Sequence, residues 1–243
     1  MSAPGPGTNQ QLLQIVADPK PTLIDGVISR MTAIDAALPG SDGLKWFNWL
    51  YLLVTNSVKN NPAAANWKDP RWLTRLDVVF ADFYFAAIES ALKGGSVPKS
   101  WQALFEARQK PGIDRIQFAL AGMNAHINHD LSLALLQTDS EFGITPGKAS
   151  PEHDDFEAVN HLLGGVLPVA LQTLAAGAGI VGELAQDSGK IGQLLALWDV
   201  KAARDLAWDF ADHLRNLRGL TRDFALATQD QLTGALGRAL LAI

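Results

Sequence analysis

A ten-residue stretch near the middle of the chain, residues 121–130, contains a dense group of side chains that can do chemistry. This polar segment holds two of the five histidines, two asparagines and one aspartate within an otherwise apolar helical pattern. If the segment is helical, His126 and Asp130 share a face because they lie four residues apart, and His129 lies beside them. Such a pair can bind one metal ion, or the carboxylate can orient the imidazole for general acid–base catalysis. A helix end that is polar only because it faces water would show the same pattern.

Asp77 is a second candidate because of where it lies on its predicted helix. It is at the edge of an aromatic-rich stripe, where an unpaired carboxylate is costly to bury. A histidine, an arginine or a metal ion would offset that cost, and His126 is a candidate partner. The alternative is a surface arrangement in which Asp77 pairs with Arg71 or Arg75.

Further histidines and aspartates lie at residues 153–161. Acidic residues in the first turn of a helix commonly serve only to favour the helix dipole, and we interpret Asp154 in this way. His161 has apolar neighbours and is expected to face partly inward, either as a core histidine or as a ligand that completes a metal sphere with Asp155. If an ion is bound, we expect divalent zinc or iron. The candidate metal ligands are then Asp77, His126, His129, Asp130, Asp155 and His161, and the candidate catalytic residues are Asp77, Asn124, His126 and Asp130.

The elements that must position these residues are all predicted to be helices. Strand-like alternation and hairpin turns are nearly absent, whereas helical spacing recurs from end to end. Proline and glycine divide the pattern into eight to ten helices, and no internal repeat or linker indicates a second domain. We therefore predict a flexible tail over residues 1–8 and a single all-α domain over residues 9–243. The helices nearest the candidate residues are expected at about 41–60, 70–93, 113–137 and from 151 onward, with a loop over 138–149.

Composition excludes several classes of function. The net charge is −5 and no block of lysine or arginine occurs, which argues against binding nucleic acid through its phosphates. Cysteine is absent, so the chain forms no disulfide and has no thiolate nucleophile. The first residues lack the basic and apolar regions of a signal peptide, and we expect a cytoplasmic protein. The expected partner is a small molecule, and the oligomeric state stays open.

An uncharged stretch over residues 162–182 is long enough to span a bilayer. It contains Pro168 and several glycines, and it has no flanking lysine, arginine or aromatic belt. We therefore expect a buried helix pair, kinked at Pro168 and broken at 177–182, and no membrane partner.

Two further patterns have simple structural explanations. Residues 177–182 match G-x-G-x-x-G, with Asp199 following at a suitable distance for a dinucleotide site. That motif has meaning only between a strand and a helix, and the neighbours here are predicted to be helical. Small residues that allow close helix packing explain it better. Seven tryptophans could line an apolar cavity, although core packing is the favoured explanation.

Three strings carry a resemblance to a known family. They are Asp42-Gly43-Leu44 with Phe47-Asn48-Trp49-Leu50-Tyr51, Leu76-Asp77-Val78 with Phe80-Ala81, and Ala121-Gly122-Met123-Asn124-Ala125-His126-Ile127-Asn128 leading to Asp130-Leu131. They resemble a bacterial, largely actinobacterial family known only as domain of unknown function 5995, over most of residues 20–165. The family name implies no activity. Its matching positions direct attention to Asp77, Asn124, His126, Asp130, Asp155 and Asn160.

A more distant likeness is to the all-helical zinc phospholipase C and nuclease group, in which a helix carries His-x-x-x-Asp. His126 and Asp130 have that spacing. The histidine that this group places soon after its aspartate is missing, because leucines fill the region after Asp130. The N-terminal tryptophan ligand is also absent. The likeness therefore does not predict a three-zinc phosphodiesterase.

The function that these residues favour is a bacterial enzyme of specialised metabolism that acts on a small, partly apolar molecule. His126 would be a metal ligand or general base, Asp130 its partner, and Asn124 a hydrogen-bond donor to the substrate. A cofactor-free cyclase or isomerase would use the same groups. The alternative is a non-catalytic ligand-binding or scaffold protein with an aromatic-lined cavity, in which the polar segment is a structural hydrogen-bond network.

Overall fold

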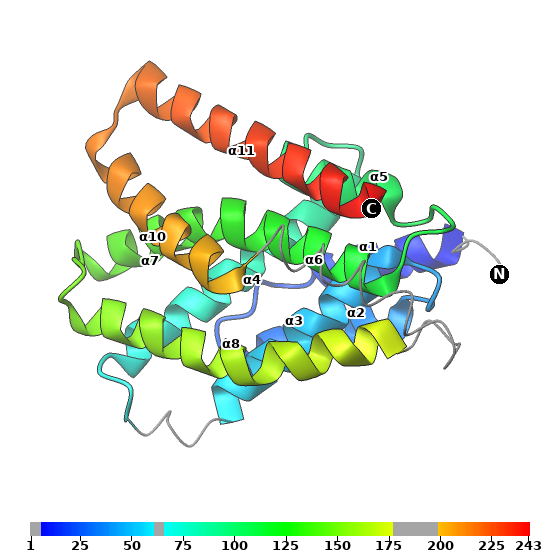
Figure 1. Ribbon diagram of the computed structural model, residues 1–243, viewed down its shortest axis with the longest axis horizontal. Helices are drawn as coiled ribbons and strands as arrows, with labels where there is room; N and C mark the ends of the chain where they lie inside the picture. The colour runs from blue at the N-terminus through cyan, green and yellow to red at the C-terminus, as the bar shows by residue number, and fades with distance from the viewer. Residues whose placement is uncertain (1–5, 61–65, 177–198) are drawn as a thin grey trace.

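The computed structural model describes residues 6–60, 66–176 and 199–243, which form helices and contain no strand (Figure 1). Because α6, η2 and α7 run on as one continuous helix, the described residues form nine helices, within the predicted eight to ten. The predicted all-α fold is confirmed. The elements are α1 (Pro6–Ala17), α2 (Ile24–Ala37), α3 (Gly43–Asn60), α4 (Pro70–Leu92), α5 (Lys99–Ala107), α6 (Arg115–Ala125), η2 (His126–Asp130), α7 (Leu131–Phe142), α8 (Pro151–Ala176), α10 (Val200–Asn216) and α11 (Gly219–Ala242).

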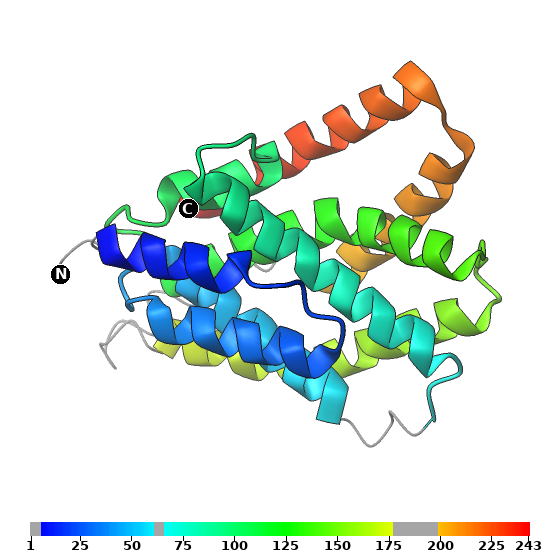
Figure 2. The ribbon, with the colours of Figure 1, turned by 180° about the vertical axis from the view of Figure 1, so that it is seen from behind.

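The continuous helix α6–η2–α7 lies in the middle of the molecule. Every residue of α6 from Ile116 to Ala125 is buried, which is expected only for a helix covered on all sides. Helices α3, α4 and α8 contact it on one side, and α5, α10 and α11 contact it on another. From behind, α4 crosses the molecule and packs against α1 and α2 (Figure 2). The polar segment is therefore enclosed.

Helix α4 begins where local sequence predicts. The side chain of Asp69 accepts a hydrogen bond from the backbone N–H of Trp72 at 3.1 Å, and Pro70 occupies the first turn. Helix α7, by contrast, ends later than the predicted residue 137. Asp139 on the extra turn accepts a hydrogen bond from Trp72 Nε1 at 2.9 Å, and Gly143 ends the helix in the left-handed region at φ 66°. Tertiary contacts thus extend the helix into the predicted loop.

Helix α8 is more exposed than the buried helix that was expected here. The helix continues through Pro168 to Ala176, and Val169 on its outer face is 64% exposed. Pro168 leaves the carbonyl of Gly164 without its helical partner, but both residues lie on the exposed face where water can bond to that carbonyl. Among the described residues, Pro151–Ala175 is the one stretch long and apolar enough to cross a membrane, a test that core helices also pass. Residues 177–182 lie outside the described residues.

The dinucleotide motif finds no support in the described parts of the chain. The residues before it belong to α8 and not to a strand. Asp199 accepts a hydrogen bond from the backbone N–H of Ala202 at 2.9 Å, so its side chain caps the first turn of α10.

Candidate functional site

The polar segment coincides with an irregularity in the central helix. Residues His126–Asp130 form a π-helical segment, in which the backbone N–H of Leu131 donates to the carbonyl of His126 five residues earlier. The carbonyl of Asn128 accepts a hydrogen bond from the side-chain amide of Gln229 on α11, which stabilises this backbone. Single π-helical turns are frequent at functional sites. The helical spacing of this segment predicted a regular α-helix, because no local sequence feature distinguishes a π-helical turn from an α-helical one.

Asp130 is a carboxylate surrounded by N–H groups. It is 2% exposed, and its Oδ2 atom lies 2.9 Å from His126 Nδ1 and 2.9 Å from Trp101 Nε1. Its Oδ1 atom lies 2.8 Å from His129 Nδ1. Burial alone would raise the pKa of Asp130, but the hydrogen bonds from the two histidines outweigh it and hold that pKa below its usual value. Asp130 is therefore ionised and orients His126.

His126 presents one free nitrogen. Its ring is 1% exposed and stacks on Phe80, with centroids 3.5 Å apart and planes 2° apart, and the ring of Tyr51 meets it edge-on. Burial lowers the pKa of His126, and the partnership with Asp130 offsets this only in part. The neutral imidazole donates through Nδ1, so Nε2 carries the lone pair. Within the described residues that buried nitrogen has no hydrogen-bond partner.

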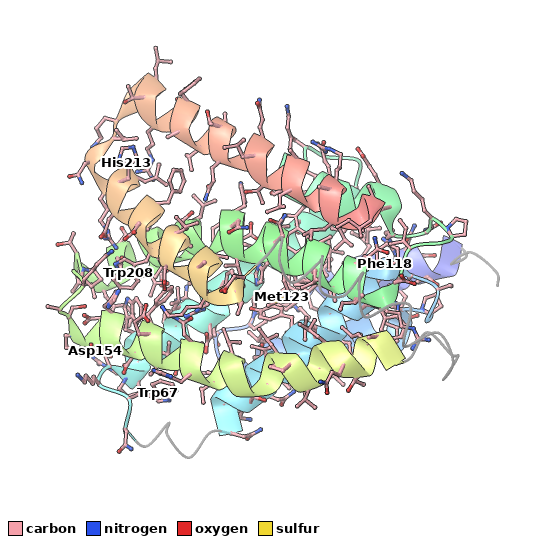
Figure 3. The ribbon with its side chains drawn as sticks, in the orientation of Figure 1. Trp67, Phe118, Met123, Asp154, Trp208 and His213 are labelled. Atoms are coloured by element: carbon pink, nitrogen blue, oxygen red, sulfur yellow. The ribbon has the colours of Figure 1, made fainter. Side chains whose placement is uncertain are left out.

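A cavity of about 50 Å³ lies between α3, α4, α8, α10 and the polar segment, and His126 forms part of its wall. An apolar cavity of about 150 Å³ holds a benzene molecule in another protein, so this one has room for roughly two or three non-hydrogen atoms. Met123, labelled near the centre of Figure 3, is one of its lining residues. The other lining residues are Tyr51, Val54, Thr55, Val58, Asp77, Phe80, Ile127, Val159, Leu163 and Arg204.

Asp77 reaches this cavity from α4. Burial raises the pKa of Asp77 from 3.8 to about 7, and the positive charge of Arg204 opposes that rise. The side chain keeps partial exposure, and it lines the cavity. Arg75, which the sequence offered as a partner, instead donates to Glu141, with 2.9 Å between Nη2 and Oε1. Asp77 therefore shares an enclosed space with His126, as predicted, and stands close to half ionised at neutral pH.

Two of the four ionisable side chains that line the cavity, Tyr51 and Arg204, were not among the predicted site residues. Arg204 on α10 is 7% exposed, and its Nε donates to Asn160 Oδ1 at 2.7 Å. Tyr51 on α3 is 6% exposed, and burial raises the pKa of its hydroxyl well above the usual value, with Asp77 as the largest charge contribution. A signal for Arg204 was present in the sequence, because Ala207 and Ala211 place this arginine on the apolar stripe of its helix.

The remaining predicted residues lie elsewhere. Asn124 is fully buried, but its Nδ2 donates to the carbonyl of Thr233 at 2.9 Å and its Oδ1 accepts from Asn128 at 2.8 Å. These bonds tie the polar segment to α11, and Asn124 does not line the cavity. His129 is bonded to Asp130, and its Nε2 lies 3.7 Å from Asp230 Oδ1. Both residues are therefore structural partners of Asp130 or of α11.

The second histidine and aspartate cluster does not join the site. Asp155 is buried, but its oxygens accept the backbone N–H groups of Lys68 and Asp69 at 2.8 and 2.7 Å. His161 is exposed, so the expectation that it faces partly inward is wrong. Neither residue lines the cavity. In the described parts of the chain, no group of three or more histidine, aspartate or glutamate side chains is placed to hold a metal ion.

Among the described residues, Tyr51 and Phe80 are the phenyl-type side chains that line the cavity, and no described tryptophan lines it. Trp72 and Trp101 are instead fully buried in the core, as the packing explanation predicted. Trp101 has the additional role of donating its indole N–H to Asp130.

Comparison with known protein families identifies the family of this chain. It belongs to the Family of unknown function (DUF5995), which matches residues 24–243. The match extends over α2 to α11 and includes every residue that lines the cavity. Comparisons with curated proteins and with solved structures find no match. Membership of DUF5995 therefore groups the chain without assigning it an activity.

Proposed function

We propose that this DUF5995 member is an enzyme that moves a proton on a small, partly apolar molecule, with His126 as the general base and Asp77 as the general acid. One observation carries the proposal. A buried, neutral imidazole with a free Nε2 atom lines the same cavity as a carboxyl group whose pKa is about 7. Acid–base residues with pKa values displaced toward neutrality are characteristic of active sites.

The base is prepared by Asp130. Its ionised carboxylate accepts the Nδ1–H of His126, which fixes the tautomer that keeps the lone pair on Nε2. When Nε2 takes a proton, the imidazolium is stabilised by the adjacent negative charge of Asp130, as in other carboxylate–histidine pairs. Trp101 and His129 hold Asp130 in place from its other sides.

The acid is prepared by burial. About half of the Asp77 side chains carry a proton at pH 7, so the group can donate to a developing oxyanion or carbanion and be reprotonated. Each correctly placed acid or base contributes roughly 10²- to 10⁴-fold to a rate. An acid and a base on one cavity suit an isomerisation, in which a proton leaves one atom and another is added elsewhere.

A zinc or iron site is the competing proposal for the same cavity. His126 Nε2 and Asp77 would supply one nitrogen and one carboxylate, whereas catalytic zinc sites use three protein ligands. Asp130, the third predicted ligand, is occupied by three N–H donors. We therefore favour acid–base chemistry by the side chains alone. Metal analysis of protein purified without a histidine tag is expected to find less than one ion per chain, and stoichiometric metal would favour the alternative.

The acid–base proposal is tested without knowledge of the substrate by ¹⁵N NMR of the histidine side chains. His126 is expected to be the neutral Nδ1–H tautomer at pH 7 and to titrate below pH 6.5. His126→Gln identifies its signals, and His161→Gln, which removes an exposed histidine, is the control. An imidazolium at pH 7, or the Nε2–H tautomer, would refute the proposal.

Activity is then sought as deuterium exchange into small carbonyl compounds in D₂O. The wild type and His161→Gln are expected to catalyse exchange in at least one compound, and His126→Gln and Asp77→Asn are expected to lose it. A different result would indicate a non-catalytic protein in which the polar segment is a structural network. In that case His126→Gln would lower the melting temperature but leave deuterium exchange and ligand binding unchanged, even though the His126 signals behave as expected. A bacterial, cytoplasmic setting in specialised metabolism stays part of this proposal.

A further inference from the structure

Arg204 is a buried positive charge without a direct ion-pair partner in the described parts of the chain. Only 7% of its surface is exposed, and no described carboxylate oxygen lies within 4.0 Å of its guanidinium. Its Nη2 donates a hydrogen bond to the backbone carbonyl of Phe156 at 2.9 Å. The Cζ atom of its guanidinium lies 4.1 Å from the centre of the Phe156 ring. These neutral groups, with Asn160, fix its position but do not neutralise it. Burying a charge in this way is costly unless an anion joins it.

The unneutralised arginine lines the cavity beside His126. A guanidinium has five N–H donors, and the bonds to Asn160 and Phe156 use two of them. Burial lowers the pKa of Arg204 only to about 10, so it remains charged at neutral pH. Among the nearby carboxylates, Asp77 does most to raise the pKa of Arg204 against the effect of burial. The two side chains nevertheless form no direct ion pair. Both side chains line the cavity, so a third group bound there would lie near both of them.

We propose that the cavity binds the carboxylate group of a small organic acid, with Arg204 as its ion-pair partner. A carboxylate has three non-hydrogen atoms, which agrees with a cavity of about 50 Å³. It is also the planar acceptor that a guanidinium binds with two parallel hydrogen bonds. Val54, Val58 and Leu163 make the rest of the cavity wall apolar, so Arg204 is the group in the wall that would attract the charge of a carboxylate.

This inference rests on the proposed function and names its substrate class. A carboxylate held by Arg204 would lie in the cavity that His126 and Asp77 line, and the proton that His126 would remove belongs to the carbon next to that carboxylate. Asp77 in its ionised form would repel the bound carboxylate, whereas its protonated form can donate to it. The charged or titratable groups around the bound anion are Tyr51 on α3, Asp77 on α4, His126 and Asp130 on η2, Glu157 on α8, and Arg204 and Asp205 on α10.

The test uses formate as the probe and formamide, which has the same shape without the charge, as its control. Binding to the full chain is followed by NMR at pH 6. Formate is expected to bind saturably and formamide not to bind. Arg204→Met, which keeps an unbranched apolar side chain, is expected to lose formate binding. Arg30→Met is the matched control, because Arg30 is also buried and bonded to backbone carbonyls but does not line this cavity.

Two additional measurements test the inference even if Arg204→Met folds poorly. The first needs no variant, because the wild type must bind formate more tightly than it binds formamide. Asp77→Asn removes the competing carboxylate and is expected to bind formate about tenfold more tightly than the wild type at pH 8, because a pKa of about 7 leaves roughly one in eleven Asp77 side chains protonated there. Equal binding of the two probes, or formate binding unchanged in folded Arg204→Met, would overturn the inference. If formate fails while His126 is the neutral Nδ1–H tautomer, the acid–base proposal still stands.

Discussion

Replacing Asp77 with asparagine tests the electrostatics of the cavity through protein stability. The pKa of Asp77 is raised from 3.8 to about 7 by burial, so the folded chain holds this proton more tightly than the unfolded chain does. Its effect on stability therefore becomes unfavourable as the pH rises from the unfolded value toward the folded value. Asparagine cannot ionise, so the Asp77→Asn variant should not lose stability in this way as the pH rises.

The magnitude follows from the size of the shift. A rise from 3.8 to about 7 is roughly three pH units, and each unit corresponds to about 1.4 kcal/mol. The penalty reaches about 4 kcal/mol well above pH 7, and it is still only about 2 kcal/mol at pH 5. Between pH 5 and pH 8 the stability of Asp77→Asn relative to the wild type should therefore increase by about 2 to 3 kcal/mol. The absolute difference at one pH also contains the altered packing, so the pH dependence is the quantity to measure.

The assay is urea unfolding of both proteins at half-unit steps from pH 5 to pH 8. Glu141→Gln is the control, because the hydrogen bond from Arg75 lowers the pKa of Glu141. A lowered pKa gives stability that is complete above the ordinary glutamate value and is lost only at more acidic pH. The difference between Glu141→Gln and the wild type should thus stay flat over this range. A flat difference for Asp77→Asn as well would show that Asp77 titrates near its ordinary value and that it cannot act as the acid.

Three further substitutions test the surroundings of the site. Trp101→Phe removes one donor from buried Asp130 and should lower the free energy of unfolding by roughly 1.5–3 kcal/mol in urea titrations, while the His126 titration shifts. Gly122→Ala places a Cβ about 2.3 Å from the ring of Phe47, and overpacking of this kind should cost roughly 1–3 kcal/mol or more, measured as a lower melting temperature. Gln229→Leu removes the side chain bonded to the π-helical carbonyl, and hydrogen exchange should accelerate in the polar segment but not in α4.

The fold was largely predictable because its signals are local. Proline in a first turn, a capping aspartate and apolar residues at helical spacing identify α4 without reference to the rest of the chain. The end of α7 was not predictable in this way, because Asp139 on its last turns is held by Trp72 and Arg215 from other helices. Pro168 was predicted to kink α8, and the helix runs on through it to Ala176, where water can reach the freed carbonyl on the exposed face.

The candidate site was only partly predictable for the same reason. His126 and Asp130 are neighbours along one helix, so their spacing revealed their contact. Arg204 comes from a helix far along the sequence, and only the packing of α10 brings it to the cavity. His161 was misplaced because its apolar neighbours in sequence lie on a different face, and the stripe of Val159 and Leu163 leaves His161 outside.

One carboxylate has two histidine partners whose pKa values shift in opposite directions, and this difference bears on what the cavity can do. Burial lowers the pKa of His129, but its hydrogen bond with Asp130 and the charges of Asp130 and Asp230 together outweigh burial and raise that pKa. His126, bonded to the same Asp130, is buried among aromatic rings, and this burial outweighs the effect of Asp130 and lowers its pKa. Of the two imidazoles bonded to Asp130, His129, toward α11, therefore gains a proton more readily than His126 as the pH falls. Asp230, fixed by the backbone N–H groups of Lys99 and Ser100 at 2.9 Å, is thus a remote group that favours a proton on His129 over one on the base at the cavity.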